Sequence, residues 1–193
     1  MVVVLLLSVS TDNIIRPTRE IRTSSNFFSV CCMSPSHMVV STYDGPRPAR
    51  MLSVDGVEAN FDRFLTFTMK TYKVDESMCT YVRSNNTLVL TDRFTHTVYI
   101  YDTAKGTSRA VTNENIQEPR GACVGSVDTV LVCSTRKNST VHLIADADIL
   151  GTYPVDISTR TAYVCLRMAI GWQCPTALEA TRNFSCIISP AMD

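Results

Sequence analysis

Short apolar and β-branched runs alternate with polar turns along most of the chain, in a strand–turn–strand unit that recurs three times. The first strands of the copies are expected at His37–Thr42, Thr87–Asp92 and Thr129–Ser134, and the second strands at Ala49–Val54, Thr97–Asp102 and Thr140–Ala145. The copies start 50 and then 42 residues apart, near the roughly 40–50-residue period of four-stranded propeller blades. The pattern therefore predicts an all-β fold made of about three four-stranded antiparallel blades.

The same pattern divides the chain into segments. We expect an irregular or strand-like N-terminal segment at 1–20 and a partial propeller at 21–169. Its blades are expected at about 21–72, 73–115 and 116–156, the first lengthened by an insertion around 63–73, with a partial fourth at 157–169. Residues 170–193 lack strand alternation and are expected to form a poorly ordered tail.

A propeller ring closes with about four to eight blades, so three blades and a part leave two sheet faces uncovered. Two expectations follow. The chain either self-associates through these blade faces, or it is part of a larger protein, as a truncated gene product without an independent function.

The third copy resembles an NHL repeat. Ile116–Val124 contains a Pro-Arg-Gly turn that leads into an inner strand, and the apolar strand Thr129–Cys133 follows. Thr87–Asp102 shows the same pattern. From about Ile21 to Val155 the chain looks like the propeller domain of molluscan tripartite-motif (TRIM-like) proteins. That resemblance implies an incomplete NHL-like β-propeller that binds RNA or protein through one face. Ligase activity is not implied, because the chain has neither a cysteine–histidine array nor heptads.

Basic residues fall in the loops that would share one face of such a propeller. Counted within the four strands of a blade, Arg93, Arg136 and Lys137 lie between the second and third strands, and Arg120 leads into the first strand. Arg47 lies between the second and third strands of the first blade. Contacts from these residues to phosphate groups would make binding salt-dependent. Acidic neighbours (Asp44, Asp92 and Glu118) dilute the patch, and the alternative is that these side chains are simply solvated.

Composition restricts the partners further. Of 193 residues, 45% are hydrophobic and 19% are charged, and eighteen basic side chains balance eighteen acidic ones. Without a global basic field, any binding of nucleic acid must use a local patch. No cofactor is expected.

The eight cysteines show neither Cys-x-x-Cys nor paired zinc-ligand spacing, which argues against a metal site. Cys31 and Cys123 occupy the same place in their blades, as buried packing residues would. We expect reduced core thiols, with disulfide or redox chemistry as the alternative. Reduced thiols favour a cytoplasmic location.

The apolar start, Met1–Leu7, has no preceding basic residue and is too short to span a bilayer, so we expect a β-strand or an ill-fitting terminal segment, and no membrane association. If it were a secretory signal, Asn85, Asn138 and Asn183 would become glycosylation acceptors.

The alternative from another class is a metal-dependent propeller lactonase or hydrolase. Such chemistry needs carboxylate and amide ligands converging from inner strands. The corresponding stretches, 28–33, 78–82 and 122–124, offer thiols, hydroxyls and apolar groups. His37, His96 and His142 are expected to be partly exposed strand residues. We therefore expect no enzymatic activity.

Overall fold

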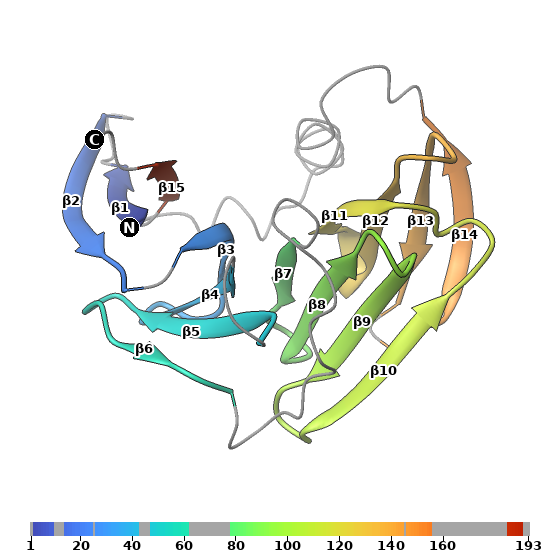
Figure 1. Ribbon diagram of the computed structural model, residues 1–193, viewed down its shortest axis with the longest axis horizontal. Helices are drawn as coiled ribbons and strands as arrows, with labels where there is room; N and C mark the ends of the chain where they lie inside the picture. Colours follow the sequence, from blue (N-terminus) through green and yellow to red (C-terminus); the bar gives the residue numbers. More distant parts are fainter. Residues whose placement is uncertain are drawn as a thin grey trace.

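The computed structural model describes residues 2–9, 14–24, 26–42, 47–61, 78–144, 146–155 and 185–190. They form four antiparallel sheets arranged as a fan (Figure 1). The insertion expected around 63–73 and the partial blade expected at 157–169 lie outside these residues, as does most of the tail.

Three sheets are four-stranded blades in which the strands follow one another along the chain. The first blade contains β3 (Phe27–Cys32), β4 (His37–Thr42), β5 (Ala49–Ser53) and β6 (Glu58–Ala59). The second contains β7 (Cys79–Val82), β8 (Thr87–Asp92), β9 (Thr97–Asp102) and β10 (Thr107–Thr112). The third contains β11 (Pro119–Val124), β12 (Val130–Ser134), β13 (Ser139–Leu143) and β14 (Ile149–Pro154), with a short 3₁₀ turn, η1 (Ser126–Asp128), between β11 and β12. The predicted all-β, blade-like architecture is confirmed.

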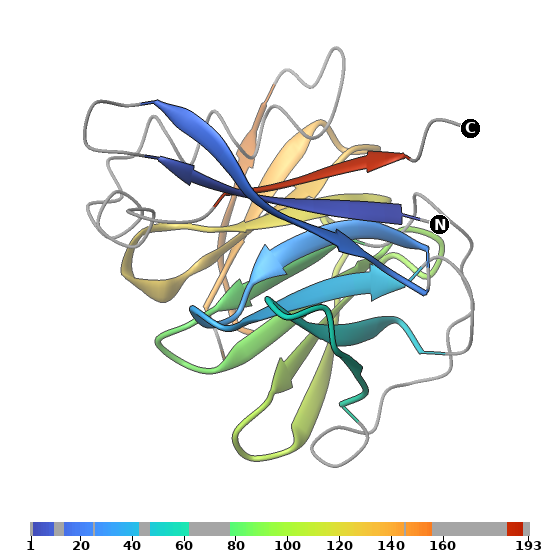
Figure 2. The same ribbon diagram turned by 90° about the vertical axis from the view of Figure 1, so that its left-hand side faces the viewer.

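The fourth sheet joins segments from opposite ends of the sequence. Its order is β15-β1-β2, with β1 (Val2–Val9), β2 (Ile15–Arg22) and β15 (Ser185–Pro190). Strand β1 pairs with both neighbours, so that Leu5 is opposite Glu20 on one side and Ile187 on the other. Figure 2 shows this terminal sheet packed beside the first blade. At 185–190 the expectation of a poorly ordered tail is therefore wrong, because these residues pair with β1.

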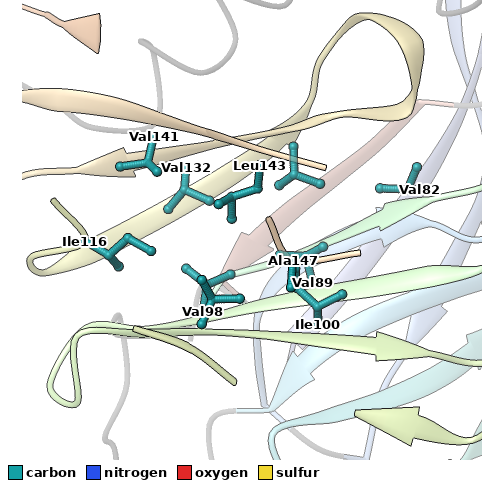
Figure 3. Close-up of a cluster of buried hydrophobic side chains, with 11 residues drawn as sticks. Val82, Val89, Val98, Ile100, Ile116, Val132, Val141, Leu143 and Ala147 are labelled. Atoms are coloured by element: carbon teal, nitrogen blue, oxygen red, sulfur yellow. The ribbon is translucent and has the colours of Figure 1, made fainter. Parts of the chain in front are cut away.

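Each blade packs on its neighbours through alternating residues of its central strands. Leu88 and Leu90 of β8 pack toward the first blade, with Val39 and Tyr81. Val89, between them, packs toward the third blade, because successive residues of a strand point to opposite faces. The second interface is drawn in Figure 3, where valines of both blades gather with Ile100, Ile116 and Leu143. Each such side chain, when fully buried, contributes about 1.5–3 kcal/mol to stability.

The terminal sheet forms a third interface, where Val4, Leu6 and Ile21 pack on Met38, Val40 and Leu52 of the first blade. This interface covers the face of the first blade that the sequence analysis expected to be uncovered. The apolar residues of β1 thus pack against the first blade.

Four-residue turns of one kind connect several strands. They span 83–86, 93–96, 103–106 and 135–138, and in each the last residue has a positive φ: Asn86, His96, Gly106 and Asn138. Glycine, asparagine and histidine tolerate this left-handed conformation better than most residues. In two turns a preceding aspartate accepts backbone N–H bonds: Asp92 from Phe94 and Thr95, and Asp102 from Ala104 and Lys105. These turns hold the exposed loop side chains on defined backbones.

Candidate binding surface

Three segments of the second and third blades meet at one end of the fan. They are the β8–β9 turn (93–96), the connection into β11 (114–118) and the β12–β13 turn (135–138). We call this the loop surface. Hydrogen bonds link the segments, so the loops expected to share a face do so.

Glu118 is the centre of these links. Its carboxylate accepts a hydrogen bond from Nε of Arg93 at 3.0 Å and forms an ion pair with Nη2 of the same side chain, also at 3.0 Å. Its backbone N–H donates to Nδ1 of His96 at 3.0 Å, and its carbonyl accepts a bond from the Thr135 hydroxyl at 2.8 Å. One residue therefore holds a turn of the second blade against a turn of the third.

A second contact fixes the β12–β13 turn. Ser134 accepts a bond from the backbone N–H of Gln117 at 2.9 Å and donates to its carbonyl at 3.1 Å, and the backbone N–H of Arg136 also donates to that carbonyl. The exposed side chains of Arg136 and Lys137 thus project from a braced backbone.

The basic side chains predicted for this face differ in their surroundings. Arg136 and Lys137 are exposed and line a hollow of about 480 Å³ together with Glu114 and Gln117. Arg120 is half-buried on β11. Within the described residues, none of the three side chains forms an ion pair. Arg93, by contrast, is neutralised by Glu118. The structure therefore brings Arg93, Arg136 and Lys137 to one surface but leaves only the last two as unpaired cations there.

Arg47 lies in the β4–β5 connection of the first blade, the counterpart of the turn that holds Arg93. Its carbonyl accepts a hydrogen bond from the hydroxyl of Thr42. The rest of the predicted loop, 43–46, lies outside the described residues. Arg47 thus lies one blade away from Arg93, in the corresponding loop of the first blade.

Phe94 is a component of the loop surface that the sequence analysis did not single out. Its ring is 57% exposed, and the guanidinium carbon of Arg93 lies 5.9 Å from the ring centroid. The signal that could have found it is a large aromatic residue inside the polar turn Asp92-Arg93-Phe94-Thr95-His96. Exposed aromatic rings next to cations are typical of binding surfaces.

In the described part of the chain, no group of three or more histidines, cysteines or acidic residues could hold a metal ion. His142 lies on β13 with its ring 6.4 Å from that of Tyr153, and His37 is exposed at the start of β4. His96 ends a turn instead of opening a strand, because it takes the positive φ of the turn's last position. No helix in the described part is long and apolar enough to cross a membrane.

Five cysteines with described side chains are free: Cys31, Cys32, Cys79, Cys123 and Cys133. Each of Cys31 and Cys123 is the fifth residue of the first strand of its blade. Cys31 pairs with Val39 and Cys123 with Leu131 on the second strand. The predicted equivalence of these two cysteines in their blades is confirmed.

Comparison with known proteins supports the fold and goes no further. No protein-family model matches the chain, and no curated protein matches it in sequence. The resemblance to NHL and tripartite-motif proteins therefore stays a prediction.

Solved structures do resemble it. A streptogramin B lyase superposes with a TM-score of 0.53 at 14% identity, over 78% of this chain and 54% of that one. Virginiamycin B lyase from Staphylococcus aureus gives 0.53 at 12% identity, over 79% and 49%. Hydrazine synthase from Kuenenia stuttgartiensis gives 0.50 at 10% identity, over 72% and 40%. The chain spans about half the length of the two lyases. At such identities a likeness shows the fold alone, and it identifies this chain as a partial β-propeller.

Proposed function

We propose that the chain is a non-catalytic interaction module of the NHL type and that its loop surface binds single-stranded RNA. The observation that carries the proposal is the exposed ring of Phe94 on the same surface as the unpaired cations Arg136 and Lys137. A base can stack on the ring while the cations contact phosphate groups.

The chemistry of the surface favours RNA over an acidic peptide. The side chains of Glu114 and Gln117 share the hollow with Arg136 and Lys137. Carboxylate and amide oxygens accept hydrogen bonds from the amino groups of unpaired bases. The side chains of an acidic peptide have no such donors. A surface that mixes acceptors, cations and one exposed ring therefore matches a single strand better.

The test is fluorescence anisotropy with a labelled single-stranded RNA oligonucleotide of mixed sequence, measured over a series of salt concentrations. Wild-type protein should bind, with an affinity that falls as salt rises. The double variant Arg136→Glu/Lys137→Glu should bind at least about tenfold more weakly and with a flatter salt dependence. Phe94→Ala should lose about five- to 150-fold, the range expected for one stacked base, with the salt dependence retained.

A matched control reverses two charges elsewhere. Arg16 lies on β2 and Arg83 in the β7–β8 turn, at the opposite end of the blade from the β8–β9 turn, and both are exposed. Arg16→Glu/Arg83→Glu should bind like the wild type. An equal loss in this control would show attraction to the protein's overall charge, and absence of any RNA binding at low salt would contradict the proposal in favour of a protein ligand.

A further inference from the structure

Two free thiols face each other where the first and second blades meet. Cys31 lies on β3 and Cys79 on β7, the strands through which the inner parts of these blades contact each other. Their sulfur atoms are 3.7 Å apart, and Cys31 donates its S–H to Cys79. Since a disulfide bond is about 2.05 Å long, the sulfurs must approach by less than about 2 Å to become bonded.

The surroundings of the two sulfurs differ in a way that assigns them different roles. Cys79 Sγ lies 3.3 Å from the hydroxyl of Ser29, and the backbone N–H of Cys79 donates to the same hydroxyl at 3.0 Å. The hydrogen bond from Cys31 lowers the pKa of Cys79 against the effect of burial, and the Ser29 hydroxyl lowers it further. The same bond, together with burial, raises the pKa of Cys31. Cys79 is therefore the more acidic thiol and the nucleophile of the pair, and Cys31 is the thiol that follows it.

We propose that Cys31 and Cys79 form an oxidisable dithiol, which a small hydroperoxide converts to a disulfide joining the first two blades. The Cys79 thiolate attacks one peroxide oxygen, the O–O bond breaks, and the departing hydroxide takes up a proton, giving a sulfenic acid and water. The sulfur of Cys31 then attacks the sulfenic sulfur, the S–O bond breaks, and a second water leaves with the thiol proton. Two electrons pass from the sulfurs to the peroxide, and a thiol reductant reverses the change.

Burial restricts the oxidant to a small molecule. Cys79 is 6% exposed and Cys31 is half-buried among the apolar residues between the blades. Hydrogen peroxide is close to water in size, whereas oxidised glutathione is a bulky peptide disulfide that cannot reach this site without opening the interface. The dithiol should therefore react with the peroxide much faster than with oxidised glutathione.

The neighbouring residue provides the matched control. Cys32 is exposed, and its sulfur contacts a guanidinium nitrogen of Arg83 instead of the thiol pair. Any thiol oxidation that merely follows exposure would occur at Cys32 before it occurs at Cys31 or Cys79. Cys32→Ser should therefore leave the bond between Cys31 and Cys79 unaffected.

The experiment treats the reduced full chain with hydrogen peroxide, blocks remaining thiols with N-ethylmaleimide, and maps the digested protein by non-reducing mass spectrometry. We expect a linked peptide pair containing Cys31 and Cys79, the loss of two free thiols, and reversal by dithiothreitol. The melting temperature should rise by several degrees, because the bond closes a long loop of the unfolded chain. Cys79→Ser, which keeps the size of the side chain, and Cys79→Ala, which keeps it apolar, should each abolish the linked peptide pair.

Wild-type peptide mapping decides the question even if a Cys79 variant fails to fold. Linked peptides through Cys32, or irreversible oxidation of single cysteines without a Cys31–Cys79 pair, would overturn the proposal. So would equal rates with hydrogen peroxide and oxidised glutathione.

Discussion

The guanidinium group of Arg93 and the carboxylate of Glu118 are 3.0 Å apart, and this ion pair connects a turn of the second blade to the segment that leads into the third. Both side chains are partly shielded from water, with 25% and 30% of their surfaces exposed. Arg93 therefore has a structural partner already, and its role at the loop surface differs from that of Arg136 and Lys137.

We predict that Arg93→Glu lowers the free energy of unfolding by about 1 kcal/mol, because the variant removes the ion pair and places two carboxylates together. Urea unfolding measures the change. Arg120→Glu is the comparison, since Arg120 forms no ion pair within the described residues, and it should change stability by less than about 0.5 kcal/mol. Equal effects of the two variants would contradict a specific role for the pair. A triple variant that changes Arg93, Arg120 and Arg136 to Glu would alter stability and binding at the same time, so its loss of binding could not be assigned to the surface alone.

A second prediction concerns Ser29. Its hydroxyl accepts the backbone N–H of Cys79 and contacts the hydroxyl of Ser41 at 2.8 Å, all in the buried contact between two blades. Ser29→Ala leaves a buried N–H without its acceptor, and we expect a loss of about 1–3 kcal/mol in urea unfolding. The exposed Ser108→Ala on β10 should be near neutral. A neutral Ser29→Ala would show that the interface rearranges to satisfy the amide.

At Val127 we expect a substitution that raises the free energy of unfolding instead of lowering it. It is 92% exposed and has a φ of 54°, which a β-branched residue rarely adopts. Val127→Gly should therefore raise the unfolding free energy by about 1 kcal/mol, since glycine takes this conformation without steric cost. Val57 is also exposed but has no positive φ, so Val57→Gly should lower stability. Thermal melts of the pair decide, and a loss in both variants would be inconsistent with strain at Val127.

Asp102 predicts a dependence on pH. Its carboxylate accepts N–H bonds from Lys105 and Ala104 and lies 3.1 Å from the Lys105 ammonium group. The bond from the Lys105 backbone is the largest cause that lowers the pKa of Asp102 below its usual 3.8. The resulting stabilisation is present above pH 3.8 and is lost as the pH falls through the lowered folded-state pKa.

Unfolding of wild-type protein and of Asp102→Asn should therefore be compared between neutral pH and about pH 2. The variant should be less stable at neutral pH, and the difference should shrink as Asp102 of the wild type becomes protonated. A difference that stays constant over this range would exclude the charge of Asp102 as its source.

The strands of the three blades could be predicted from the sequence because their pattern is local. β4, β8 and β9 have the predicted bounds, and β12 begins one residue later than predicted, at Val130. Short β-branched runs between polar turns determine a strand almost by themselves. The pairing of β15 with β1 was not predictable in this way, because it joins residues from opposite ends of the sequence. The same holds for the cysteine pair, since Cys31 and Cys79 belong to different blades.

The candidate surface was predictable in part. The sequence analysis placed the loops of Arg93, Arg136 and Lys137 on one face, because alternate turns of an antiparallel blade emerge on alternate faces, and hydrogen bonds through Glu118 link these loops. It took Glu118 as a diluting charge, whereas the structure makes it the residue that holds the loops together. A positive φ of 50° at Glu118 directs these contacts, and such a backbone conformation at a glutamate leaves no mark in the residue pattern.

The terminal sheet sets an order for folding during synthesis. Val4 and Leu6 pack on the first blade from a strand whose partner, β15, is made almost a full chain length later. Until the ribosome has released 185–190, one edge of β1 has no strand to pair with and could bind extended segments of other nascent chains. The three blades can form in the order in which they are synthesised. The terminal sheet is completed last, so slow release or early termination upstream of β15 would leave an apolar strand with an open edge, a substrate for chaperones.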